Sequence, residues 1–187
     1  MPLTVVCGPM YAEKSTTLYR HVSRALRAGK SVAVIVPELD TRSKGQIKTH
    51  NGLTLASLDV RPIVVSKSRS IYTKLPDKRP DLLVIDEAQF FDGDLPMYLV
   101  SMMGLSPATQ IVVAGLDLTS EGRPFGPMAD LLCLADHVEK LTAICSCGAE
   151  ATRTRCSVKK DEDVLVGGSE AYVPVCLPCW LRKDPKQ

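Results

Sequence analysis

The sequence predicts an α/β fold, in which helices flank a parallel β-sheet and a small, differently built lobe follows at the C-terminus. Nearly continuous runs of Val, Ile and Leu alternate with helix-like segments as far as about residue 141. Uninterrupted apolar runs are typical of strands covered on both faces, and their alternation with helices is typical of βαβ units. Beyond residue 141, cysteines and glycines replace this pattern.

The part of the chain up to about residue 141, called the sheet domain below, alternates expected strands and helices. Strands are expected at residues 3–7, 31–36, 62–65, 82–86 and 110–114, and helices at 15–28, 95–103 and 128–135. The first helix carries Leu18, Val22 and Leu26 on one stripe, and Gly29 stands where a helix ends. Two single cysteines, Cys7 and Cys133, lie in apolar stretches and are interpreted as core residues.

Composition excludes several classes of protein. The chain has 187 residues, 45% of them hydrophobic, and a net charge of +2, which together argue against disorder. The near balance of charge gives no electrostatic footprint for nucleic acid. No apolar run approaches the roughly 18 to 20 residues of a membrane-spanning helix, and no signal-peptide pattern opens the chain. We therefore expect a cytoplasmic protein with reduced thiols and no membrane or nucleic-acid partner.

A phosphate-binding loop is predicted between the first strand and the first helix. The segment Gly8-Pro9-Met10-Tyr11-Ala12-Glu13-Lys14-Ser15 matches the Walker A pattern except that Glu13 replaces its second glycine. In such a loop, backbone N–H groups and the helix N-terminus surround the phosphates of ATP. Lys14 would neutralise phosphate oxygens and Ser15 would hold Mg²⁺.

The matching half of a nucleotide site follows the strand at 82–86. Its two carboxylates, Asp86 and Glu87, have the Walker B form. Asp86 would complete the magnesium shell, and Glu87 would act as a base toward an attacking oxygen. Because both halves occur in the proper context, the sequence predicts a P-loop NTPase or kinase.

Glu13 is the main irregularity of that site. If its carboxylate faced the phosphates at ~5 Å, each negative charge would cost about 3 kcal/mol at an effective dielectric constant of about 20. If it pointed to water ~8 Å away, the cost would fall to roughly 0.5 kcal/mol. The sequence leaves both orientations open.

Four cysteines of the C-terminal lobe have the spacing of a structural zinc site. Cys145 and Cys147 form one pair, and Cys176 and Cys179 form a second pair with the common CxxC spacing. Cys156 could replace one of the four. The expected domains are therefore residues 1–141, a P-loop nucleotide-binding domain, and residues 142–187, a zinc-binding lobe with a loop that covers the substrate.

Taken together, the motifs resemble the type II thymidine kinases. The resemblance rests on Gly8-Pro9-Met10, on Asp86-Glu87-Ala88-Gln89-Phe90-Phe91, on Arg123-Pro124-Phe125-Gly126, and on the two cysteine pairs flanking Gly167-Gly168 and Tyr172. It implies transfer of the γ-phosphoryl group of ATP to the 5′-hydroxyl of thymidine or deoxyuridine. It also implies a homotetramer. Ser120 stands where the family often has an aromatic residue, which leaves a modified pyrimidine nucleoside open as the substrate.

The resemblance also implies residue roles. Glu87, Lys14 and Arg42 would be catalytic, while Gln89 and Asp86 would join the loop residues 8–15 around the nucleotide. Residues that match the nucleoside pocket are Met10, Asp40, Phe90, Leu116, Phe125, Thr154, Leu165, Val166, Gly167, Gly168 and Tyr172. The stretch 165–168 and Thr154 would read the base through hydrogen bonds largely made by the backbone.

Two other functions remain open on the residues alone. Glu13 is compatible with a catalytically weakened relative that binds nucleosides or regulates a partner. A P-loop ATPase that uses a zinc ribbon to hold nucleic acid would need a basic ribbon. The cations Arg153, Arg155, Lys159 and Lys160 are followed at once by Asp161, Glu162 and Asp163, which disfavours that ribbon.

Overall fold

A six-stranded parallel sheet forms the centre of the molecule. The computed structural model describes residues 3–39, 52, 54–157 and 171–182. The strands of the sheet are β1 (Leu3–Cys7), β2 (Val32–Pro37), β3 (Ile63–Val65), β4 (Leu82–Ile85), β5 (Gln110–Gly115) and β6 (His137–Lys140). Their order across the sheet is β3-β2-β4-β5-β1-β6, and every pairing is parallel. This architecture confirms the predicted fold class.

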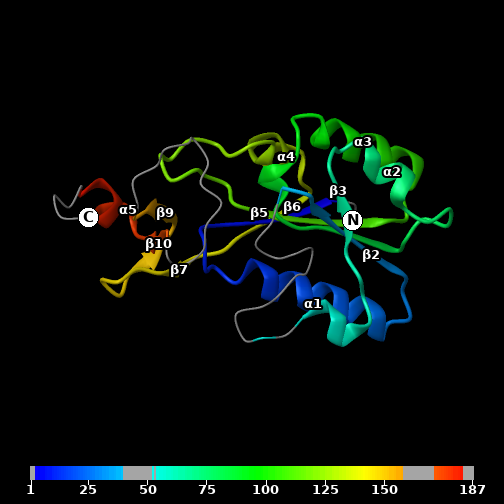
Figure 1. Cartoon of the computed structure of the whole chain (residues 1–187), viewed down its shortest axis with the longest axis horizontal. Helices are drawn as coiled ribbons and strands as arrows, with labels where there is room; N and C mark the ends of the chain where they lie inside the picture. Colours follow the sequence, from blue (N-terminus) through cyan, green and yellow to red (C-terminus); the bar gives the residue numbers. More distant parts are fainter. Residues whose placement is uncertain (1–2, 40–51, 53, 158–170, 183–187) are drawn as a thin grey trace.

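Helices cover both faces of this sheet (Figure 1). The α1 helix (Lys14–Arg27) lies on one face with the short 3₁₀ turn η1 (Leu55–Leu58), while α2 (Ser70–Lys74), α3 (Leu95–Leu105) and α4 (Met128–Leu134) lie on the other. A further 3₁₀ turn, η2 (Ala88–Phe90), follows β4. None of the helices in the described part combines the length and the hydropathy that a membrane-spanning helix requires.

The strands β1, β2, β4 and β5 are buried because they are apolar on both sides. Leu18 and Val22 of α1 are fully buried against one face, together with Val84 of β4. Leu95 and Leu99 of α3 are fully buried against the opposite face. The continuous apolar runs in the sequence reflect this double coverage.

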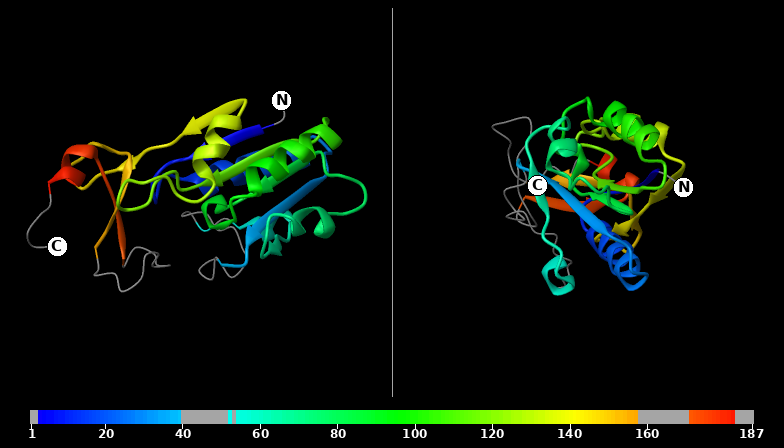
Figure 2. Two further views of the ribbon diagram at one scale, coloured as in Figure 1. Left: turned by 90° about the horizontal axis from the view of Figure 1, so that it is seen from above. Right: turned by 90° about the vertical axis from the view of Figure 1, so that its right-hand side faces the viewer.

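A small cysteine-rich region lies beyond one end of the sheet (Figures 1 and 2). We define the cysteine lobe as the described residues 143–157 and 171–182. Its elements are β7 (Ala143–Ile144), β8 (Glu150–Ala151), β9 (Arg153–Cys156), β10 (Tyr172–Val175) and α5 (Leu177–Leu181). They form two antiparallel pairs, β7 with β8 and β9 with β10.

Three features differ from the sequence prediction. Cys133, expected in the core, is exposed on α4, whereas Cys7 is buried as expected. The edge strand β6 was not predicted, because His-Val-Glu-Lys is polar and its residues are mostly exposed. The short helix α2 was also missed, since five residues carry too little periodicity to be recognised.

Candidate functional site

The candidate site lies at the carboxyl edge of the sheet, where three neighbouring strands end. β1 leads into the phosphate loop, β4 leads into Asp86 and Glu87, and β5 leads into Leu116 and Asp117. The register places Cys7 opposite Gly115, and Ile85 opposite Val113. Because the strands are parallel, the segments that follow them lie at one edge of the sheet, which is where open α/β sheets bind ligands.

The phosphate loop has the tight backbone that its sequence pattern requires. Gly8 has a φ of 142°, and a Cβ atom there would lie 2.4 Å from the carbonyl oxygen of Leu141. Only glycine allows this close approach without movement of the chain. Tyr11 and Glu13 also have positive φ, at 66° and 60°.

Glu13 occupies the N-cap position of α1 in the left-handed conformation. This conformation explains why the Walker A pattern has glycine there, since a residue with a Cβ adopts it at a cost of roughly 1–2 kcal/mol. The Glu13 side chain is exposed. Its carboxylate is therefore solvated, which is the less costly of the two orientations that the sequence left open.

Lys14 interacts with both halves of the nucleotide motif. Its Nζ donates hydrogen bonds to the carbonyl oxygens of Pro9, at 2.7 Å, and Gly8, at 3.2 Å. Burial lowers the pKa of the Lys14 ammonium, and the nearby carboxylates of Glu87 and Asp86 oppose that shift. The structure thus places the Walker A lysine within electrostatic range of both Walker B carboxylates.

The two Walker B carboxylates differ in environment. Asp86 is buried, and its Oδ1 accepts a hydrogen bond of 2.9 Å from the backbone N–H of Glu87. Glu87 is half-buried and has a φ of 50°, so its backbone turns sharply after the strand. The Nε2 group of Gln89 donates a hydrogen bond to Oε2 of Glu87. A buried carboxylate beside a more accessible one fits a division between cation binding and proton transfer.

The expected pocket residues are brought together in pairs. The rings of Phe90 and Phe125 are 5.7 Å apart and meet edge to face. The backbone N–H of Met10 donates to Oγ1 of Thr154 at 3.0 Å, which connects the phosphate loop to the cysteine lobe. Tyr172 lies on β10, which pairs with the strand of Thr154. The predicted residues Asp40, Arg42, Leu165, Val166, Gly167 and Gly168 lie outside the described residues.

An ion pair between Asp117 and Lys140 was missed by the sequence analysis. The carboxylate of Asp117 is buried, and its Oδ2 lies 2.9 Å from Nζ of Lys140. The charge of Asp117 also opposes the lowering of the Lys14 pKa that burial causes. Its place just after β5 was a usable signal, because polar residues that follow parallel strands gather at the ligand-binding edge.

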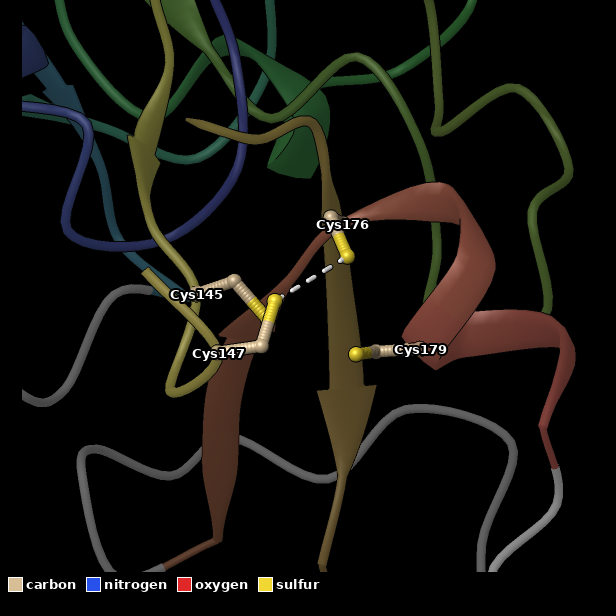
Figure 3. A group of neighbouring side chains, drawn as sticks. All are labelled: Cys145, Cys147, Cys176 and Cys179. Carbon is tan, nitrogen blue, oxygen red and sulfur yellow. Dashed lines mark hydrogen bonds between the residues drawn. The ribbon is translucent and has the colours of Figure 1, made fainter. Parts of the chain in front are cut away.

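Four cysteines form a second candidate site in the lobe (Figure 3). The sulfur atoms of Cys145, Cys147, Cys176 and Cys179 all lie within 4.8 Å of one another. The Sγ atoms of Cys147 and Cys176 are 3.6 Å apart. Tetrahedral zinc with Zn–S distances of about 2.3 Å would separate its sulfur ligands by about 3.8 Å, so the cluster can hold such an ion. Cys156 is outside this group.

The thiols of this cluster influence one another's ionisation. Hydrogen bonds from the backbone amides of Cys147 and Cys176 lower the pKa of Cys145 to about 6. Hydrogen bonds with the other three cysteines raise the pKa of Cys179 to about 12. The cluster therefore stabilises a thiolate at Cys145, and thiolate is the form that binds metal.

Comparison with known proteins yields one consistent result. The family model described as "Thymidine kinase" matches residues 1–180. A curated relative, the thymidine kinase of Bacteroides thetaiotaomicron, is 37% identical over 182 residues, which cover 96% of this chain and 87% of the relative. The matched region includes the phosphate loop, the carboxylates after β4 and all four clustered cysteines.

Proposed function

Since this chain belongs to the thymidine kinase family, and is thereby an ATP-dependent kinase that phosphorylates thymidine, we propose that the carboxyl edge of the sheet carries out the transfer. The observation that carries this proposal is that the loop with Lys14 follows β1 and the carboxylates Asp86 and Glu87 follow β4, so that both lie at the carboxyl edge of the sheet. This arrangement supports Lys14 as the cation for the phosphates and Glu87 as the base.

In this proposal each group has one task. The backbone of residues 8–15 and the ammonium of Lys14 bind the phosphates of ATP. Glu87 accepts the proton of the thymidine 5′-hydroxyl as its oxygen attacks the γ-phosphorus atom in line with the departing ADP oxygen. Arg42 would stabilise the charge on the transferred group, as the family resemblance implies.

The nucleoside would bind beside Glu87. Phe90, Leu116 and Phe125 supply apolar walls for a planar base, and Met10, Thr154 and Tyr172 border it from the loop and the lobe. Residues 165–168 and Asp40 belong to the same proposed pocket.

Two metal sites complete the proposal. Ser15, next to Lys14, and the buried carboxylate of Asp86 are suitable ligands for Mg²⁺. This ion would neutralise the β- and γ-phosphate oxygens. Zinc would be held by the four clustered cysteines in a purely structural role.

We propose a homotetramer in the cytoplasm, with residues 1–141 as the nucleotide-binding domain and 142–187 as the zinc-binding lobe. Light scattering of the purified protein would test the tetramer, and a monomer at micromolar concentration would contradict it.

Kinetics of a Glu87→Gln variant would test the central assignment. The substitution removes the base but keeps the size of the side chain, so kcat should fall by about 10² or more. Thymidine binding, measured by calorimetry, should stay within about threefold of the unmodified protein. Glu150→Gln, an exposed acid on β8, is the control and should retain full activity. Unaltered turnover of Glu87→Gln would exclude Glu87 as the base.

A further inference from the structure

The side chain of Gln89 bridges the proposed base and the wall of the nucleoside pocket. Gln89 is 3% exposed. Its Nε2 donates to Oε2 of Glu87, and its Oε1 accepts the backbone N–H of Leu116 at 2.9 Å. We call these two hydrogen bonds the Gln89 bridge. Both polar ends of the amide are thus engaged within the protein.

The orientation of this amide is fixed by its partners. The backbone N–H of Leu116 can only donate, so the atom facing it must be the carbonyl oxygen of Gln89. The NH₂ group must then face Glu87, and an ionised carboxylate can only accept. A flipped amide would lose both hydrogen bonds, so the bridge has one orientation.

Two glycines provide the space that Gln89 occupies. A Cβ atom at Gly115 would lie 2.7 Å from Oε1 of Gln89, and also 2.7 Å from Sδ of Met128. A Cβ atom at Gly126 would lie 2.2 Å from the backbone oxygen of Gln89, and Gly126 has a φ of 51°. Side chain and backbone of Gln89 are therefore both enclosed, which restricts the rotamers available to it.

We propose that Gln89 is a positioning residue that fixes the carboxylate of Glu87 relative to the pocket wall at Leu116. This inference rests on the proposed function, in which Glu87 is the base. A base works only within about 2.6–3.2 Å of the proton that it removes, and a displacement of about 1 Å can cost roughly 10² in rate. One amide that holds both the base and the wall sets that distance before the nucleoside binds.

The bridge assigns Gln89 a different task from the one implied by resemblance, which placed it at the nucleotide. A nucleotide ligand would contribute to ATP affinity, whereas a positioning residue contributes to the chemical step. The two roles are therefore separated by comparing kcat with the KM values for ATP and thymidine.

Two variants of Gln89 test the proposal directly. Gln89→Leu keeps the volume but removes both hydrogen bonds, and kcat should fall about 10- to 100-fold with both KM values changed less than about threefold. Gln89→Glu keeps the shape, but two ionised carboxylates would face each other. Protonation of the new carboxyl group restores a donor, so its kcat relative to the unmodified protein should rise as the pH is lowered.

Gly115→Ala approaches the same bridge from the other side. The added methyl group displaces Oε1 of Gln89, so kcat should fall about tenfold. In a Gln89→Ala background that oxygen is gone and only the contact with Met128 remains, so the same substitution should lower kcat less than about threefold and should act on the free energy of unfolding instead. Gly104→Ala, which would meet nothing within 4 Å, is the matched control and should retain full activity.

The outcomes separate this proposal from the one on which it rests. Full activity of Glu87→Gln would overturn the base assignment itself. An inactive Glu87→Gln together with an unaltered kcat in Gln89→Leu would overturn only the positioning role, as would a rise confined to the KM for ATP. If Gln89→Leu fails to fold, the pH profile of Gln89→Glu and the Gly115→Ala pair decide, and additive effects in that pair contradict the bridge.

Discussion

The sheet domain and the cysteine lobe are stabilised by different means. The sheet domain buries large apolar side chains completely on both faces, among them Leu18, Leu83 and Leu99. The lobe instead buries small ones, chiefly Ala143, Ala151 and two of the cysteines. A fully buried leucine contributes about 1.5–3 kcal/mol, and an alanine far less. We therefore expect the lobe to depend on the proposed metal site, whereas the sheet domain depends on its core.

The proposed functional site lies where these two regions meet. Ala12 of the phosphate loop packs in the apolar cluster of the lobe, and Met10 donates to Thr154 of β9. In another contact between the two regions, the indole Nε1 of Trp180 donates to the carbonyl oxygen of Ser120 at 3.1 Å. Loss of order in the lobe should thus reach the phosphate loop, although the sheet beneath it stays folded.

The largest expected effect follows from breaking the metal site with Cys176→Ser. Metal content should fall well below one equivalent, and amide exchange of β7–β10 should rise while that of α1 stays protected. Activity should fall by about 10² or more, because an open lobe no longer contacts Met10. Exchange measured by mass spectrometry, with metal analysis, checks both statements.

Two other cysteines serve as controls for this variant. Cys133→Ser lies on α4 and should change neither metal content nor activity. Cys156→Ser should also keep the metal, because Cys156 is outside the cluster. Metal loss in Cys156→Ser, or a lobe that stays protected in Cys176→Ser, would contradict the four-cysteine site.

A substitution in the apolar core should instead destabilise the sheet domain. Leu83→Ala leaves a cavity in the sheet domain and should lower its free energy of unfolding by about 2–5 kcal/mol. Leu181→Ala, on the 65% exposed leucine of α5, should change it by less than about 0.5 kcal/mol. Circular dichroism would follow the sheet, and fluorescence of the only tryptophan in the sequence, Trp180, would follow the lobe.

Dichroism and Trp180 fluorescence report on the sheet domain and on the lobe separately. Leu83→Ala should shift the dichroism transition in urea and leave metal content unchanged. If fluorescence and dichroism shift equally in every variant, the two regions unfold as one unit and the distinction drawn between them fails.

The sequence predicted the sheet domain well because its signals are local. The expected strands at 82–86 and 110–114 differ from β4 and β5 by only one residue at the C-terminal end. A short apolar run between turns predicts a buried strand without knowledge of the rest of the chain. The phosphate loop and the four cysteines were likewise readable from spacing. The polar edge strand β6 and the exposure of Cys133 were not, because both depend on which face of an element the rest of the chain covers.

The contacts within the candidate site could be predicted only in part from the sequence, for a related reason. Gln89 and Leu116, or Asp117 and Lys140, lie far apart in sequence, and nothing in their spacing predicts that their side chains meet. The motif letters identified the Walker B acids but not the hydrogen bonds that orient them. Such contacts appear only once strand order and register are known.

A smaller effect is expected at the irregular position of the phosphate loop. Glu13→Gly relieves the left-handed backbone and should raise the free energy of unfolding by about 0.5–1 kcal/mol, after the greater chain entropy of glycine is subtracted. Because the Glu13 side chain is exposed, the affinity for ATP should change only about twofold. Urea denaturation and calorimetry with ATP check the two effects.

Asp59→Gly is the matched control for this variant. Asp59 is also an acidic residue with positive φ, at 55°, but it follows η1. It should gain similar stability with unchanged ATP affinity. A tightening of ATP binding of tenfold or more by Glu13→Gly would show that its carboxylate faces the phosphates after all.

The smallest effect concerns acid, which should act on the two regions separately. His21 on α1 is half-buried, and burial lowers its pKa below the ordinary value of 6.5. Glu139 opposes this shift, and Arg20, Arg24 and His137 reinforce it. The histidine lines a cavity of about 460 Å³ at the amino edge of the sheet, whose charged and titratable members are Arg20, His21, Arg24, Lys30, His137 and Glu139.

The sign of the effect follows from the direction of that shift. Above pH 6.5 the imidazole is mostly neutral in both states and contributes nothing. As the pH falls through 6.5 the unfolded chain takes up the proton first, so the sheet domain loses stability until the pH passes the lowered pKa.

His21→Gln should flatten this loss in dichroism-detected urea transitions at pH 7.5, 6.5 and 5.5, whereas His137→Gln on the exposed edge strand should change it less. If the lobe holds zinc as proposed, acid should also release that metal by protonating the thiols. Trp180 fluorescence should report this second transition, and it should be the same in both variants. A fluorescence transition that moves with His21→Gln would mean that protonation in the sheet domain opens the lobe, and the independence of the two regions would be lost.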